Sequence, residues 1–197
     1  LFRIALSCLV DADHSDTARH YRDPVATQTP ALLAPEKRLK LLDEYVTELG
    51  RHKNDERSQL RAVVYRECRD ADCSPGFLAC DSPVGSGKTT AIMAHLLKTA
   101  VVKKLRRVFV VLPFTNIIDQ SVGVYRKALV HTDEVGDDIV VAHHHRAEFE
   151  DPAARLYSFL WHAPIVVTTA VQFFETLAAR KPAALRPGPM KQPPSFV

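Results

Sequence analysis

The stretch Asp81–Leu97, DSPVGSGKTTAIMAHLL, decides the fold of this 197-residue chain. It places Gly85 and Gly87 directly before Lys88 and a segment with the apolar spacing of a helix. Glycine adopts backbone conformations that are closed to other residues, so main-chain N–H groups there can approach an anion closely. The N-terminus of the following helix adds a partial positive charge. The stretch is therefore predicted to hold phosphate.

The stretch follows the P-loop pattern G-x-x-x-x-G-K-[ST] with one departure, because Ser82 stands where the first glycine is expected. Lys88 can reach the β- and γ-phosphates, and the Thr89 hydroxyl can ligate Mg²⁺, so we predict catalytic roles for both and ATP with Mg²⁺ as the cofactors. A glycine-rich turn before an ordinary helix is the alternative, and the predicted strand before the loop argues against it. The predicted ATP-binding residues are Ser82, Pro83, Val84, Gly85, Ser86, Gly87, Lys88, Thr89 and Thr90.

Apolar runs and helical patterns alternate along the chain from Ser74 onward. This alternation predicts an α/β fold with a parallel sheet flanked by helices, of the P-loop (RecA-like) type. Two further helices are predicted upstream, at 36–50 and 58–69. The expected strands are 76–83, 106–113, 137–143 and 163–169, and the expected helices between and after them are 89–102, 115–130, 151–161 and 170–180.

Composition limits the possible partners and compartments. The 26 Lys and Arg residues nearly balance 23 Asp and Glu residues, so nucleic acid would bind through local patches rather than through a basic field over the whole surface. The four cysteines show no C-x-x-C spacing, which favours reduced thiols in a cytoplasmic protein. No membrane-spanning segment is predicted. The first residue is leucine, so we expect a fragment of a longer protein.

Small polar residues follow two of the predicted strands. In an open parallel sheet, ligands bind beyond the carboxyl ends of the strands. Short hydroxyl and amide side chains there suit contacts with a nucleic-acid backbone that are independent of base sequence. The predicted contacts with single-stranded DNA are Pro113, Thr115, Asn116, Thr168 and Thr169.

Three strings, SPVGSGKTT, VVLPFTNIIDQ and WHAPIVVTTAVQFFETL, occur in this order. Together they resemble the helicase–nuclease of type I CRISPR interference systems, an HD-type nuclease fused to a superfamily 2 DEAD/DEAH-like helicase. The likeness covers most of the chain from Ser58 onward. It implies ATP-dependent unwinding and degradation of foreign DNA in antiviral defence, with an RNA-guided CRISPR surveillance complex as partner. It also implies an adenine-side contact for Arg61, with an ordinary surface arginine as the alternative.

By the same likeness, residues 1–21 are expected to be the C-terminal end of an HD-type nuclease domain, because LSCLVDADHSDTARHY at 6–21 resembles the last helix of that domain. Asp13 would then ligate a divalent transition metal of the parent protein, with Asp11 as the rival and a solvated helix-end aspartate as the plainer interpretation. One carboxylate cannot hold a two-metal centre, so we expect no nuclease activity from this chain. The expected division is a linker and connecting helix at 22–57 and a first RecA-like ATP-binding domain at 58–197, truncated before the Walker B motif. Such a fragment would bind ATP at most.

Two other functions stay open from the sequence. One is another superfamily 2 DNA translocase, of the restriction type, and the other is a non-catalytic nucleotide- or nucleic-acid-binding remnant. The run His143–His145 could bind metal. Adjacent side chains diverge and rarely close on one ion, however, so a strand-end loop near DNA is the alternative. The basic residues at 103–107 could face DNA or could form a solvated helix end.

Overall fold

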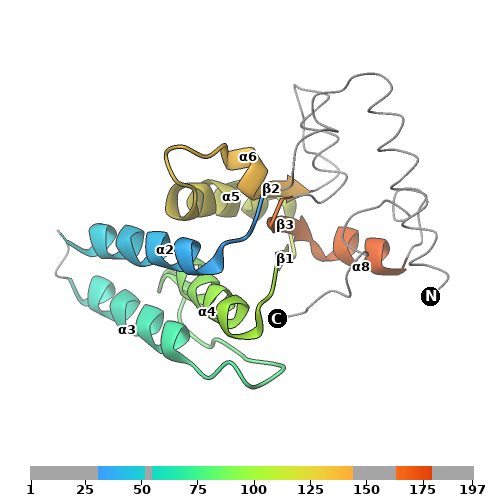
Figure 1. The fold of residues 1–197 in the computed structure, drawn as a ribbon. Coiled ribbons are helices and arrows are strands. Elements are labelled where there is room, and N and C mark those ends of the chain that lie inside the picture. The colour runs from blue at the N-terminus through green and yellow to red at the C-terminus, as the bar shows by residue number, and fades with distance from the viewer. Residues whose placement is uncertain (1–30, 52–54, 144–162, 179–197) are drawn as a thin grey trace.

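The computed structural model describes residues 31–51, 55–143 and 163–178. The segment 1–21 with Asp13 and Asp11, the helix predicted at 151–161 and most of the histidine run lie outside these ranges. The elements in chain order are α2 (Pro35–Gly50), α3 (Glu56–Asp70), α4 (Lys88–Lys103), β1 (Val108–Leu112), α5 (Thr115–Leu129), α6 (Gly136–Ile139), β2 (Val140–His143), β3 (Ile165–Thr169) and α8 (Ala170–Ala178) (Figure 1).

The described strands form a parallel sheet in the order β1-β3-β2. Ile165 of β3 pairs with Val108 of β1 on one side and with Val140 of β2 on the other. Every residue of β3 is buried, as expected for a central strand covered on both faces. The predicted α/β class with a parallel sheet and flanking helices is therefore confirmed.

Alternate residues of β3 supply the cores on the two faces of the sheet. Ile165 and Val167 pack into a large cluster with residues of α2, α4 and α5. Val166 faces the other way, into a smaller cluster with Phe173 of α8, whose ring centroid lies 5.8 Å from that of Phe109. Figure 1 shows α8 on the opposite side of the sheet from α2 and α4.

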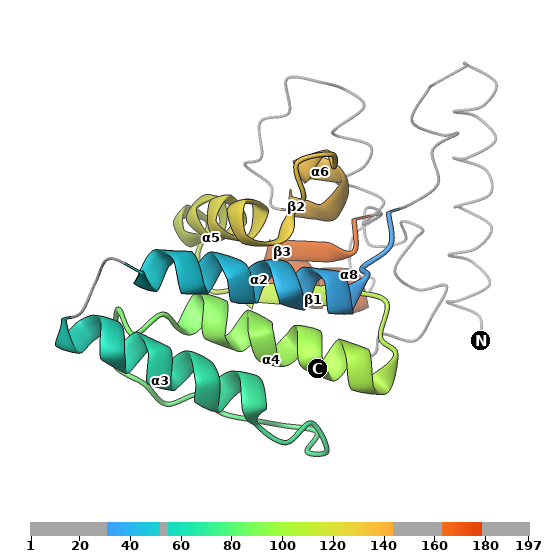
Figure 2. The same cartoon turned by 60° about the vertical axis from the view of Figure 1, so that its left-hand side comes forward.

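Helices α2, α4 and α3 lie side by side, with α4 between the other two (Figure 2). The sequence predicts a linker and connecting helix at 22–57. In the structure, Leu42 of α2 is fully buried in the same cluster as Leu97 of α4. A bidentate ion pair from Arg69 to Asp43, at 2.8 Å for both contacts, joins α3 to α2. Helix α2 is thus an integral part of the folded body.

The strand predicted at 76–83 is wrong, because no strand forms there. Phe77 is 98% exposed, and residues 75–82 make no backbone–backbone hydrogen bond to any described residue. A strand requires a partner for its N–H and C=O groups. Instead, a cavity of about 770 Å³ separates this segment from the edge of β1 that faces away from β3. The strand predicted at 137–143 also begins later, at Val140, because the turn of α6 occupies its first residues.

Candidate phosphate-binding site

The loop before α4 adopts the backbone conformation that its glycines allow. Gly85 has φ 82° and Gly87 has φ 83°, both in the left-handed region that other residues rarely enter. A Cβ atom on Gly85 would also lie 2.3 Å from Nη2 of Arg57. The left-handed conformation therefore accounts for glycine at both positions.

The first turn of α4 leaves main-chain donors available. Gly87 is the N-cap residue and supplies no side-chain cap. The first helical bond runs from the Ala91 N–H to the Gly87 carbonyl oxygen at 3.1 Å. Among the described residues, no acceptor pairs with the backbone N–H groups of Lys88, Thr89 and Thr90. These donors, together with the positive end of the helix dipole, form a site that favours an anion.

The Lys88 side chain folds back over the loop. Its Nζ atom donates a hydrogen bond to the Ser82 carbonyl oxygen at 2.5 Å, so the ammonium group closes the loop from its last residue to its first. Ser86 is only 1% exposed, and its hydroxyl is hydrogen-bonded to that of Ser82. Ser82 therefore has a structural role in place of the glycine that the pattern expects.

The remaining residues of the predicted ATP site line the outside of the loop. Pro83 and Val84 are exposed. Thr89 is also exposed, and its hydroxyl makes no hydrogen bond within the described part of the chain. The Thr90 hydroxyl is already used, because it donates to the Gly87 carbonyl oxygen at 3.0 Å. Thr89 is thus the hydroxyl that fits the predicted role of Mg²⁺ ligand.

Helix α3 places two arginines on the loop. Nε of Arg61 donates to the Gly85 carbonyl oxygen at 2.9 Å, so Arg61 holds the main chain of the loop in this structure. Arg57 lies one helical turn earlier and covers Gly85, where it makes no hydrogen bond or ion pair with another described residue. Sequence reasoning missed Arg57. Its i, i+4 spacing from Arg61 was the one available signal, since such residues share a helix face.

The predicted nucleic-acid contacts differ in how available they are. Pro113 and Asn116 are exposed, and Thr115 is half-buried at the start of α5. The Thr168 hydroxyl is buried and donates to the His143 carbonyl oxygen at 2.7 Å. The Thr169 hydroxyl accepts a hydrogen bond from the Gln172 N–H at 3.2 Å and so caps α8. The parallel strands bring all these residues to the same edge of the sheet, and Pro113 and Asn116 are the most accessible there.

The cavity beside β1 begins at the loop before α4, residues 82–88, which we call the phosphate loop. Asp81, Lys88 and Thr89 line its polar end, and apolar side chains of α3, α4 and β1 form most of its wall. Its volume of about 770 Å³ lies within the range of ligand pockets. The arrangement can therefore hold an anionic group at the loop and an apolar group beside it.

No metal-binding group of three or more His, Cys, Asp or Glu side chains occurs within 31–51, 55–143 and 163–178. In the same ranges, each helix is too short or too polar to cross a lipid bilayer. No protein-family model matches the chain, and no curated protein matches it. The function proposed below therefore rests on the residues and geometry of the chain and on the resemblance described from its sequence.

Proposed function

We propose that this chain is the nucleotide-binding part of an ATP-dependent DNA helicase–nuclease that unwinds and degrades foreign DNA in CRISPR antiviral defence. The observation that supports ATP binding best is the set of N–H donors at the start of α4 that no described residue pairs with. They lie beside an ammonium group and behind two left-handed glycines, Gly85 and Gly87. A triphosphate supplies acceptors for these donors, which have none among residues 31–51, 55–143 and 163–178.

Each residue of the loop has a distinct role in this proposal. Lys88 exchanges the neutral Ser82 carbonyl for a phosphate oxygen, and a charge-assisted hydrogen bond of this kind is the stronger of the two. The N–H groups at 88–90 bind the phosphates, and the Thr89 hydroxyl ligates Mg²⁺. Bound Mg²⁺–ATP would supply the phosphoryl group whose transfer drives the motor.

The DNA and partner assignments follow from the position of the strand ends and from the family resemblance. Pro113, Thr115 and Asn116 contact the backbone of single-stranded DNA, since they follow β1 at the carboxyl edge of the sheet. Thr168 and Thr169 belong to the same edge, and their hydroxyls contribute only if the bonds to His143 and Gln172 are exchanged. The nuclease metal at Asp13 and recruitment by an RNA-guided complex rest on the resemblance alone.

ATP binding is tested by titrating the chain with a fluorescent ATP analogue in the presence of Mg²⁺. Lys88→Ala should weaken binding at least tenfold, which corresponds to about 1.4 kcal/mol. Lys103→Ala is the matched control, because Lys103 is an exposed lysine at the other end of the same helix. Equal affinity of the Lys88→Ala and wild-type proteins, or no binding by the folded wild-type chain, would refute the proposal.

A further inference from the structure

Two cysteines from separate segments meet beside the phosphate loop. Cys68 lies in the last turn of α3, and Cys80 lies in the extended segment that enters the loop. Their sulfur atoms are 3.6 Å apart, and both residues are partly buried. Cys73 lies between them in sequence, yet it is buried and its thiol contacts the Ala71 carbonyl oxygen at 3.8 Å instead.

The two sides of this thiol pair are held to different degrees. The end of α3 is fixed to α4, because His95 donates to the Cys68 carbonyl oxygen and Lys98 donates to that of Ala71, both at 3.1 Å. Residues 75–82, by contrast, make no backbone–backbone hydrogen bond within the described part of the chain. Cys80 can therefore move toward Cys68 to close the distance to the roughly 2.05 Å of a disulfide bond.

We propose that Cys68 and Cys80 are a reversible redox pair, and that oxidation links them in a disulfide that ties α3 to the segment entering the phosphate loop. The oxidant is a low-molecular-weight disulfide such as oxidised glutathione. Cys80 attacks one of its sulfurs and releases the first glutathione thiol. Cys68 then attacks the mixed disulfide and releases the second, so one S–S bond breaks, one forms, and both thiol protons end on glutathione.

The surroundings of Cys68 disfavour its thiolate form. Burial, together with the hydrogen bond to Cys80, raises the pKa of Cys68 to about 11. Cys68 is therefore a protonated thiol at neutral pH. It can react once Cys80 carries glutathione, because the mixed disulfide is held next to it.

A disulfide at this place bears on the nucleotide site. Cys80 is two residues before Ser82, whose carbonyl oxygen holds the Lys88 ammonium group. Drawing Cys80 toward α3 displaces that carbonyl relative to the loop. We expect the oxidised protein to bind ATP at least threefold more weakly, a consequence that rests on the proposed function.

The disulfide itself is tested on the full chain, equilibrated with mixtures of reduced and oxidised glutathione and then digested for mass mapping. The expected product is a peptide pair joined through Cys68 and Cys80, which a dithiol reductant reverses. Cys73→Ser should leave it unchanged, whereas Cys68→Ser or Cys80→Ser should abolish it. Circular dichroism confirms that each variant is folded. Pairing with Cys73 or Cys8, or mixed disulfides alone, would overturn the proposal.

The ATP titration separates this proposal from the previous one. If the reduced protein binds no ATP while the Cys68–Cys80 disulfide still forms, the proposed function fails and the redox pair stands. If the reduced protein binds ATP and no Cys68–Cys80 disulfide forms, the redox pair fails alone. A disulfide that leaves ATP affinity unchanged would refute its effect on the loop.

Discussion

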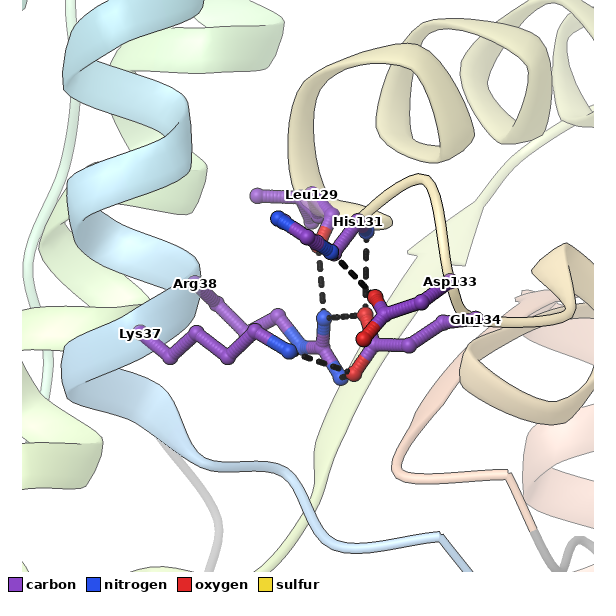
Figure 3. A network of polar contacts seen from close by, with 6 residues as sticks. All are labelled: Lys37, Arg38, Leu129, His131, Asp133 and Glu134. Carbon is purple, nitrogen blue, oxygen red and sulfur yellow. Dashed lines mark hydrogen bonds and ion pairs between the residues drawn. The ribbon is translucent and has the colours of Figure 1, made fainter.

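Positively charged groups gather in two regions of this molecule, and the two regions differ in whether the chain itself supplies the partners of these groups. In the phosphate loop, the donors of α4 have no acceptor in the described structure. In the cluster around Arg38, which we call the Arg38 cluster, the charge is neutralised within the chain (Figure 3). The cluster consists of Lys37, Arg38, Leu129, His131, Asp133 and Glu134.

The Arg38 cluster joins α2 to the turn after α5. Arg38 is 1% exposed, and its guanidinium donates to the Leu129 carbonyl oxygen at 2.9 Å and to both carboxylate oxygens of Glu134. Glu134 also accepts hydrogen bonds from Lys37 Nζ and the His131 N–H, each at 2.9 Å. Nε of Arg38 is the buried side-chain nitrogen that lacks a partner within the described residues.

The difference between the two regions separates structural from ligand-binding cations. A buried guanidinium with an internal carboxylate partner fixes two elements relative to each other, and its charge is neutralised without a ligand. The ammonium and N–H donors of the loop are satisfied only in part, by one carbonyl oxygen. Changes in the Arg38 cluster should therefore alter stability, whereas changes in the loop should alter nucleotide binding.

Removing the buried cation should have the largest effect on stability. Arg38→Ala leaves Glu134 and the Leu129 carbonyl without their main partner and also creates a cavity. Breaking a fully buried ion pair costs about 3–5 kcal/mol. Because Glu134 is partly exposed and keeps its bond to Lys37, we expect about 3 kcal/mol, the lower end of that range. We expect urea denaturation to show a loss of this size.

The matched control is Lys40→Ala on the same helix. The Lys40 side chain is 80% exposed, and it faces Glu44 at 4.0 Å. An exposed pair of this kind contributes about 0.5 kcal/mol or less. A loss below 1 kcal/mol for Arg38→Ala, or equal losses for the two variants, would contradict a structural role for the Arg38 cluster.

Acid should weaken the same cluster. The hydrogen bond from Arg38 lowers the pKa of Glu134 from 4.5 to about 2. A carboxyl whose pKa is lower in the folded state stabilises the fold above the unfolded value, and this contribution is lost as pH falls from 4.5 toward 2. At neutral pH we expect it to reach about 2 kcal/mol, because partial exposure of Glu134 reduces the full effect.

The comparison that measures this effect is between the wild type and Glu134→Gln. The difference in their free energies of unfolding should be largest near neutral pH, should fall to about a quarter of that value by pH 2.5, and should vanish only below pH 2. Other carboxyl groups titrate in both proteins, so their contributions cancel. A difference that does not change with pH would show that the charge of Glu134 is not what stabilises the turn.

Much of the fold could be predicted from local patterns, because helices and buried strands depend on the spacing of apolar residues. The predicted helix at 115–130 and strand at 163–169 match α5 and β3 closely. Apolar spacing alone could not show whether 76–83 forms a strand, since a strand also depends on a hydrogen-bonding partner elsewhere in the chain. Arg38 was equally hidden, because Glu134 lies 96 residues away.

The same distinction applies to the candidate site. Gly85, Gly87 and Lys88 are within four residues of one another, so their shared geometry follows from the sequence. The arginine contacts from α3 and the approach of Cys68 to Cys80 come from packing between separate segments. No local pattern predicts such contacts.

The smallest substitutions, from glycine to alanine, test whether the first turn of α4 binds the nucleotide. Gly87→Ala forces alanine into a left-handed backbone with φ 83°, which costs about 1–2 kcal/mol. Because the strain lies at the N-cap of α4, relaxing it would turn the N–H donors, so ATP should also bind several-fold more weakly. Urea denaturation and ATP titration of the same preparation measure both effects.

Gly123→Ala is the matched control, because Gly123 lies inside α5 and a Cβ there would meet nothing within 4 Å. Alanine in a helix interior is favoured over glycine by about 0.5–1 kcal/mol, so this variant should be slightly more stable than the wild type, with unchanged ATP affinity. If Gly87→Ala also gained stability, its left-handed backbone would not be required. If it lost stability but kept full ATP affinity, the first turn of α4 would not bind the phosphates, and the contrast with the Arg38 cluster would fail.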